Sequence, residues 1–154
     1  MQAETTPVLP QGCTNFKLRQ LMRRVAHHYD TEMAGCGLKI TQYSLLSHVL
    51  KLGPIRPGDL AAAMKMDAST LTRNLRPLVD SGWVVLAPGA DARSRLVHIT
   101  DAGRAKRAEA QRRWKVAQKA LNDALGVERV LALHALVDEA LALLAPAQEE
   151  VVHG

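Results

Sequence analysis

Apolar residues recur at helical spacing along nearly the whole of this 154-residue chain, and one short region departs from that spacing. Before residue 80 and after residue 100, apolar side chains return every three or four positions, as in amphipathic helices. Between them, the runs 83–86 and 95–99 are rich in apolar and β-branched residues, and turn-forming residues join them. The pattern predicts a mainly α fold with one small β-hairpin.

Local signals place the ends of the predicted helices. A long first helix precedes a second helix with Thr41 as its N-cap, and Pro57 suits the first turn of a short third helix. Asp67 is the expected N-cap of a fourth helix, and two helices, about 101–126 and 127–145, follow the hairpin.

The composition fits a single globular domain over residues 1–154. Hydrophobic residues make up 47% of the chain, and aromatic residues only 3%. No apolar stretch approaches the roughly 20 residues of a membrane span, and the N-terminus lacks the features of a secretory signal. We therefore expect a cytoplasmic protein with no membrane partner.

The charge is distributed unevenly along the chain. Residues 65–119 contain 12 basic and 5 acidic side chains, whereas residues 120–154 contain 1 basic and 6 acidic side chains. A basic excess of this kind can be a solvated helix surface, or it can face a polyanion such as nucleic acid. The secondary structure predicted for residues 65–119 distinguishes a solvated surface from a surface that binds nucleic acid.

Two short helices joined by a tight turn, and followed at once by a hairpin, are typical of a winged helix-turn-helix. In the fourth helix, Leu71, Leu75 and Leu78 fall on one side and polar residues on the other. Hydroxyls and guanidinium groups suit contacts with bases and phosphates of double-stranded DNA. The DNA-binding candidates on this helix are Ser69, Thr70, Thr72, Arg73 and Arg76.

The loop of the hairpin adds three further candidates, Asp91, Arg93 and Arg95. An arginine at the tip of a wing can enter the minor groove, where the negative potential is strong. Asp91 is expected to hold the loop and to orient Arg93 through a charge-assisted hydrogen bond. The simpler alternative is an Asx turn beside a solvent-facing arginine.

Several stretches of the chain together resemble the MarR family of transcriptional regulators. They are Thr41–Leu46, Ser69–Arg73, Leu78–Val84, Asp91-x-Arg93 and Leu96–Gly103. The resemblance implies a winged helix-turn-helix over about 41–100, with the wing at 83–99, and dimerisation helices at about 12–40 and 101–146. It also implies a homodimeric repressor that leaves its operator when a small aromatic effector or an oxidant acts, with Arg93 as the wing arginine.

The residues of the last helix support a homodimer independently. This helix is apolar on more than one stripe, which is excessive for the surface of a monomer. Two copies related by a two-fold axis would present two recognition helices to a palindromic operator.

Two alternatives to a ligand-released repressor stay open. Cys13 lies where a helix N-terminus would lower the pKa of a thiol, although the family's peroxide-sensing cysteine aligns with Asn15 of this chain. A winged helix can also dock proteins without reading DNA. The chain lacks nucleophile, phosphate-loop and zinc motifs, so we expect no enzymatic activity, cofactor or metal site.

Overall fold

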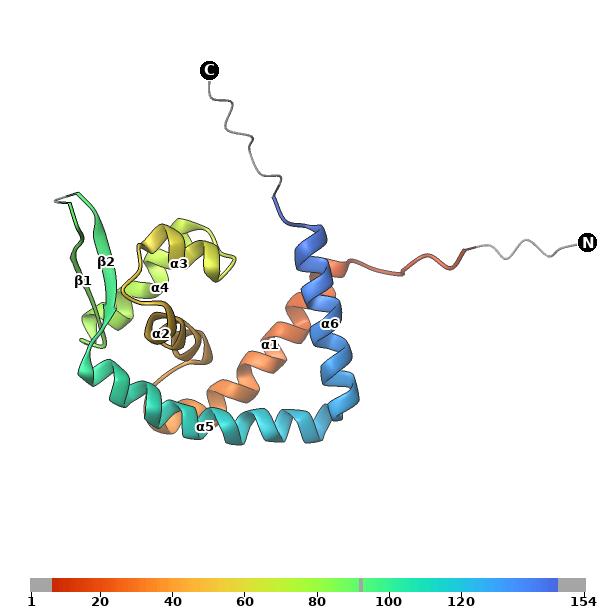
Figure 1. The fold of residues 1–154 in the computed structure, drawn as a ribbon. Coiled ribbons are helices and arrows are strands. Elements are labelled where there is room, and N and C mark those ends of the chain that lie inside the picture. The colour runs from red at the N-terminus through yellow and green to blue at the C-terminus, as the bar shows by residue number, and fades with distance from the viewer. Residues whose placement is uncertain (1–6, 92, 147–154) are drawn as a thin grey trace, which may run out of the picture. The chain divides into compact units, whose positions relative to one another are not determined.

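The computed structural model describes residues 7–91 and 93–146 and divides into two compact units, Met1–Ala117 and Gln118–Gly154. The mainly α fold with an antiparallel hairpin is confirmed (Figure 1). The single domain expected over 1–154 stays a prediction. The elements are, in order, α1 Thr14–Met33, the 3-10 turn η1 Ala34–Cys36, α2 Ile40–Leu52, α3 Pro57–Ala63, α4 Ala68–Asp80, β1 Val84–Pro88, β2 Arg95–Ile99, α5 Asp101–Leu125 and α6 Val127–Leu143.

The core of the first unit lies where α2, α3, α4 and the hairpin meet. The predicted apolar stripe of α4 faces this core, because its leucines lie on one side of the helix. The fully buried larger side chains are Met33, Leu45, Leu46, Val49, Leu60, Leu71, Leu78, Val84 and Val97. Burial of this stripe fixes the rotation of α4 about its axis, and the opposite side of the helix is left exposed.

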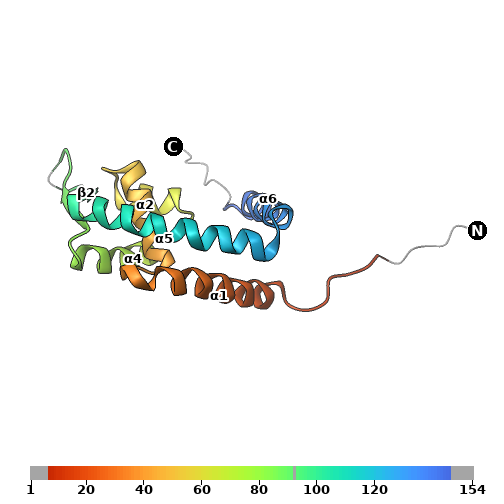
Figure 2. The same cartoon turned by 90° about the horizontal axis from the view of Figure 1, so that it is seen from below.

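The later turns of α1 lie beside α5 (Figure 2). The His28 Nε2 atom lies 2.9 Å from the carbonyl oxygen of Ala117, and the Arg113 guanidinium lies 4.0 Å from the Glu32 carboxylate. Two polar contacts of this kind hold the end of α1 to the part of α5 that belongs to the first unit.

The start of α2 differs from the sequence-based prediction. Thr41 is not its N-cap but lies inside the first turn, and the cap position is occupied by Lys39. The Asp30 carboxylate of α1 accepts a hydrogen bond from the Ile40 amide at 2.7 Å, and Gln42 Oε1 accepts one from the Lys39 amide at 2.9 Å. A partner from another helix therefore supplies the cap that the local sequence was expected to provide.

The helix-turn-helix follows its local signals closely. Pro57 begins α3, and the turn to α4 passes through Lys65, whose φ of 54° is left-handed. Asp67 is the N-cap of α4, as predicted, and its carboxylate accepts the Thr70 amide at 2.7 Å.

The hairpin is longer on its first side than the sequence indicated. The first strand was expected over 83–86, but β1 continues to Pro88, which pairs with Arg95. Ile55 also exchanges two backbone hydrogen bonds with Val97, at 3.2 and 2.8 Å. The segment between α2 and α3 is thus attached to the inner strand of the wing.

The described part of the chain has no helix that is long and apolar enough to cross a membrane.

Candidate nucleic-acid interface

The structure brings the five candidate residues of the fourth helix to one side of α4. Ser69, Thr72, Arg73 and Arg76 are exposed and Thr70 is half-buried, while the leucine stripe faces the core. Between its N-cap and its last residue, Asp80, the helix has no acidic side chain. The side of α4 that points away from the core therefore combines hydroxyl groups with two cations.

The N-terminus of α4 is organised by the Asp67 carboxylate. Its Oδ1 atom accepts hydrogen bonds from the Ser69 hydroxyl and the Thr70 amide, both at 2.7 Å, and its Oδ2 atom accepts one from the Thr70 hydroxyl at 2.8 Å. The hydrogen bond from the Ser69 hydroxyl, followed by those from Thr70, lowers the pKa of Asp67 from 3.8 to about 2. The sequence predicted Asp67 as the cap. It did not show that Ser69 and Thr70, two of the DNA-binding candidates, donate hydrogen bonds to the Asp67 carboxylate.

We expect the Asp67 carboxylate to titrate near pH 2 in the folded protein. Because its pKa is lowered on folding, the carboxylate stabilises the fold fully above its unfolded pKa of 3.8, and this contribution is lost as the pH falls towards 2. A carbon-13 NMR titration of the carboxyl signals measures the midpoint, and Asp67→Asn identifies the signal. A midpoint near 3.8 would contradict the three hydrogen bonds.

The Asp91 carboxylate holds the loop of the wing through the backbone. Its Oδ1 atom accepts the amides of Arg93 at 3.0 Å and Ser94 at 2.8 Å, and these bonds, that of Arg93 first, lower the pKa of Asp91. Asp91 therefore holds the loop and hydrogen-bonds to Arg93, as predicted, and the donor is the backbone amide of Arg93. Asp91 thus forms the Asx turn that was the simpler alternative, and Arg93 and Arg95 are both exposed.

Arg56 is a further cation beside the wing that sequence reasoning missed. It follows Ile55, which is paired with β2, and it is exposed. It occupies the N-cap position of α3 without a side-chain capping hydrogen bond, and its charge contributes to the lowered pKa of Asp91. The sequence did contain a signal for Arg56: an arginine stands at a helix N-cap, where Ser, Thr, Asp or Asn is usual.

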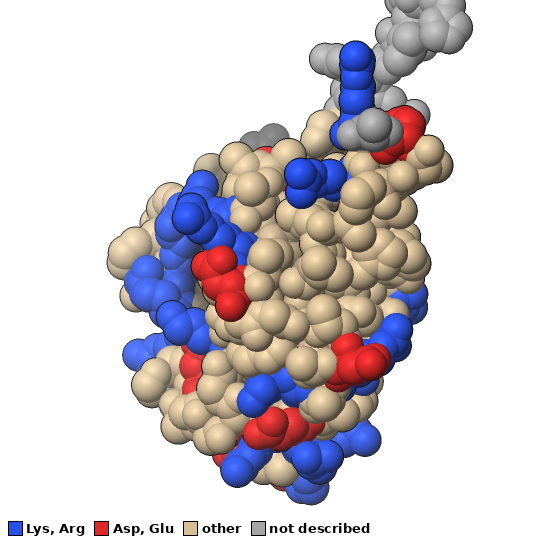
Figure 3. Space-filling view, turned by 90° about the vertical axis from the view of Figure 1, so that its left-hand side faces the viewer, with Lys and Arg blue, Asp and Glu red and all other residues tan. Residues whose placement is uncertain are grey.

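Positive charge gathers on the side of the molecule where the wing lies. In Figure 3, Lys and Arg atoms (blue) form groups near the top, along the left edge and across the lower part, with fewer Asp and Glu atoms (red) among them. This distribution agrees with the basic excess of residues 65–119.

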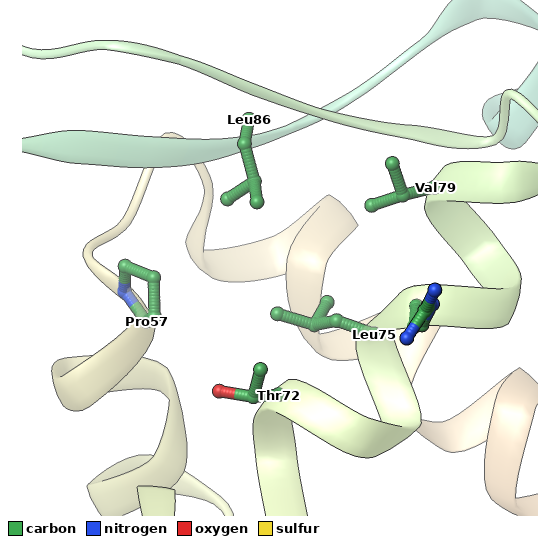
Figure 4. A pocket seen from close by; sticks show the side chains of 6 residues that line it. Pro57, Thr72, Leu75, Val79 and Leu86 are labelled. Atoms are coloured by element: carbon green, nitrogen blue, oxygen red, sulfur yellow. The ribbon is translucent and has the colours of Figure 1, made fainter. Parts of the chain in front are cut away.

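A cavity of about 240 Å³ lies between α4 and the wing (Figure 4). Its walls are mainly apolar and come from α3, α4 and β1. They comprise Pro57, Thr72, Leu75, Arg76, Val79 and Leu86. Thr72 and Arg76 therefore border both this cavity and the exposed side of α4.

A second cavity, of about 380 Å³, lies among α1, α2 and α5. Tyr43 and Trp114 are stacked, with ring centroids 6.0 Å apart, and the Arg107 guanidinium lies 5.8 Å from the Tyr43 ring. Arg107 also donates to the Ser47 hydroxyl at 3.2 Å, and burial raises the pKa of Tyr29. The remaining lining residues are Ile40, Ser44 and His48. The cavity combines aromatic walls with a cation.

The two cysteines occupy different environments. Cys13, the redox candidate, is exposed at the N-cap of α1, and its role stays a prediction. Cys36 is buried in the core, where its thiol donates to the carbonyl oxygen of Met33 at 3.1 Å. Over residues 7–91 and 93–146, no three His, Cys, Asp or Glu side chains lie close enough together to hold a metal ion.

Large apolar side chains are exposed on two helices, one in each unit. On α1, Phe16 and Met22 are 59% and 69% exposed, and on α6, Leu136 and Leu143 are 64% and 78% exposed. Exposed apolar residues in such number on single helices are typical of surfaces that another chain covers.

Comparisons with known proteins agree with this geometry. A model of the MarR family matches residues 37–94, which contain the helix-turn-helix and most of the wing. The chain is 29% identical over 84 residues to YwoH, an uncharacterized HTH-type transcriptional regulator of Bacillus subtilis. That match covers 54% of this chain and 61% of YwoH.

Two solved structures are similar over most of their length. The transcriptional regulator MosR of M. tuberculosis, solved in complex with DNA, is 30% identical, with a TM-score of 0.70 over 84% of this chain and 98% of MosR. A probable transcriptional regulator of Pseudomonas aeruginosa is 25% identical, with a TM-score of 0.75 over 82% of this chain and 96% of that one. The winged helix-turn-helix, its exposed α4 and these similarities have one explanation: the chain belongs to the MarR family of DNA-binding transcriptional regulators, which are not enzymes.

Proposed function

We propose that this regulator is a cytoplasmic homodimeric repressor that binds a palindromic operator and releases it when a small aromatic acid binds. The observation that carries the proposal is the exposed side of α4, where Arg73 and Arg76 stand opposite the buried leucine stripe. Membership of a DNA-binding family favours reading of DNA over the alternative of a protein-docking module.

In this proposal, α4 lies in the major groove and the wing lies over the adjacent minor groove. Arg73 and Arg76 would hold guanine edges, since a guanidinium matches the two acceptors of guanine. Arg93 would enter the minor groove, and Arg56 and Arg95 would contact phosphates beside it.

Replacing Arg73 by alanine should cost about 1–3 kcal/mol of binding free energy at a specific operator and relax base preference at one position of each half-site. Fluorescence anisotropy with a duplex selected by the protein from a random library, and with a random duplex, measures both effects. Lys39→Ala, which removes an exposed cation far along the chain from α4, is the matched control. Equal losses on the two duplexes would show that Arg73 contacts phosphate.

Replacing Asp91 by alanine should weaken DNA binding, although it removes a negative charge from the wing. The Asp91 carboxylate holds the Arg93 and Ser94 amides, so its loss releases the loop that presents the Arg93 side chain. In a double-mutant cycle with Arg93→Ala, we expect a coupling of at least about 0.5 kcal/mol. Tighter binding by Asp91→Ala, or strictly additive losses, would contradict this role.

The exposed apolar residues of α1 and α6 support the homodimer. Each set would be covered if equivalent helices of two chains packed together, and two chains would present two α4 helices with two-fold symmetry. A protein with one α4 would read only one half-site.

The cavity among α1, α2 and α5 is the proposed effector site. Tyr43 and Trp114 offer aromatic walls, and Arg107 offers a cation for a carboxylate. Arg107 belongs to α5, which follows directly after the wing, so a ligand here would contact the helix that connects the wing to the rest of the chain.

We expect 4-hydroxybenzoate to raise the melting temperature of the protein and to weaken its binding to the selected duplex. The neutral analogue 4-hydroxybenzyl alcohol should do neither, because it lacks the charge that Arg107 would bind. In Arg107→Met, which keeps a flexible unbranched side chain but removes its charge, both effects of 4-hydroxybenzoate should be lost. Equal responses in wild type and Arg107→Met would place the effector elsewhere.

A further inference from the structure

At the N-terminus of α4, the hydroxyl protons of Ser69 and Thr70 are already donated in hydrogen bonds within the protein. A hydroxyl has one proton to donate and two lone pairs that accept. Ser69 Oγ lies 2.7 Å from Asp67 Oδ1, and Thr70 Oγ1 lies 2.8 Å from Asp67 Oδ2. An ionised carboxylate can only accept hydrogen bonds, so both hydroxyls must be the donors. Their lone pairs are all that they can offer to a ligand.

These hydrogen bonds are stronger than ordinary ones, because the acceptor is charged. At neutral pH the carboxylate is ionised, since its pKa lies at about 2. Thr72 is different, because its hydroxyl donates to the neutral carbonyl oxygen of Ala68 at 2.9 Å and can turn away at a smaller cost. The hydroxyls of Ser69 and Thr70 are therefore held firmly as donors, whereas that of Thr72 can reorient.

A hydroxyl that can only accept is a poor partner for phosphate. Phosphate oxygens at neutral pH carry no proton to donate, and the negative charge of Asp67 would repel a phosphate placed beside either hydroxyl. In the major groove, by contrast, the N6 amino group of adenine and the N4 amino group of cytosine are donors. Residues at the N-terminus of a recognition helix are the ones that reach base edges.

We infer that Ser69 and Thr70 contact DNA as hydrogen-bond acceptors, and that the N-terminus of α4 reads the exocyclic amino group of adenine or cytosine. The inference rests on the proposed entry of α4 into the major groove. It assigns complementary chemistry to one helix: the two hydroxyls accept from amino groups, while Arg73 and Arg76 donate to guanine. Asp67, which touches no base in this account, positions both hydroxyls.

The direct test uses duplexes modified at single bases. A duplex selected by the full-length protein from a random library is resynthesised with N6-methyladenine or N4-methylcytosine at one position at a time. The methyl group occupies the groove side of the amino group, while base pairing is kept. We expect wild-type affinity to fall about 10-fold at one or two positions in each half-site, because an acceptor is left without its donor.

The double variant Ser69→Ala/Thr70→Val should bind the unmodified duplex more weakly and should no longer respond to methylation at those positions. The Asp67 carboxylate and the backbone amide of residue 70 remain in this variant, so the helix keeps its capping hydrogen bond. Ser81→Ala, which removes an exposed hydroxyl from the other end of α4, is the matched control and should respond to methylation as wild type does.

Asp67→Asn tests the positioning role. Asparagine is a favourable N-cap, so the helix should persist, but the negative charge is removed and the hydroxyls are held less firmly. We expect stronger binding to random DNA, a steeper dependence of affinity on salt concentration, and a smaller effect of amino-group methylation. A structural role alone would lower the melting temperature without changing the preference among bases.

The outcomes separate this inference from the proposed function. Insensitivity to amino-group methylation at every position, with Arg73→Ala still losing specificity, would overturn the inference and leave α4 as the reading helix. Insensitivity together with equal losses of Arg73→Ala on selected and random DNA would overturn both.

Discussion

The double substitution Leu136→Glu/Leu143→Glu should yield a folded monomer whose affinity for a palindromic operator falls at least about 100-fold. Both leucines are largely exposed and lie seven residues apart on the same side of α6, so charges there do not disturb a protomer's core. In a dimer they would be covered, and burying two carboxylates without partners is strongly unfavourable. A monomer has one α4 and therefore contacts one half-site of the operator instead of two.

Sedimentation velocity measures the state of association, and anisotropy with the selected duplex measures the affinity. Leu136→Met/Leu143→Met, which keeps the same two positions apolar and adds no charge, is the control and should remain a dimer with near wild-type affinity. A dimeric double variant that binds normally would remove α6 from the interface.

Replacing Gly103 by alanine should lower the free energy of unfolding by about 3 kcal/mol or more and the melting temperature by about 10 °C. A Cβ atom at this position would collide with the carbonyl oxygen of Trp83 and lie 2.9 Å from Ile99 Cγ1. The Gly103 amide also donates to the Thr100 hydroxyl at 3.0 Å, and that hydroxyl donates to the carbonyl oxygen of Gly82 at 2.7 Å. The first turn of α5 therefore lies directly against the base of the wing.

Gly58→Ala is the matched control for this substitution. It is also a helical glycine, but a Cβ atom there would meet nothing within 4 Å. Since alanine restricts the unfolded chain more than glycine does, Gly58→Ala should stabilise the protein by about 0.5–1 kcal/mol. Thermal unfolding followed by circular dichroism compares the two variants, and an unchanged melting temperature in Gly103→Ala would refute the close approach.

The order of the elements could be predicted because their signals are local. The leucine stripe of α4, the cap at Asp67 and the proline at the start of α3 each depend on residues that lie within a few positions of one another. The resemblance of several short stretches to the MarR family was sufficient to place α4 and the wing.

Features that depend on residues distant in the sequence could not be predicted. The cap of α2 comes from Asp30, ten residues before the amide that it binds, so Thr41 was a reasonable but wrong choice. The cavity with Tyr43 and Arg107 needs helices separated by some sixty residues to meet. The Asp91 side chain had two plausible partners, and only the folded loop selects the backbone amides.

Native mass spectrometry of the protein with its selected duplex shows whether two chains read a palindrome through two α4 helices. We expect two chains for each duplex, and a loss of the complex when either half-site is scrambled. We also expect Arg73→Ala to lose more complex on the selected duplex than on a random one. A single chain bound to each duplex, or equal amounts of complex on intact and scrambled sites, would show that the protein does not read a palindrome as a symmetric pair.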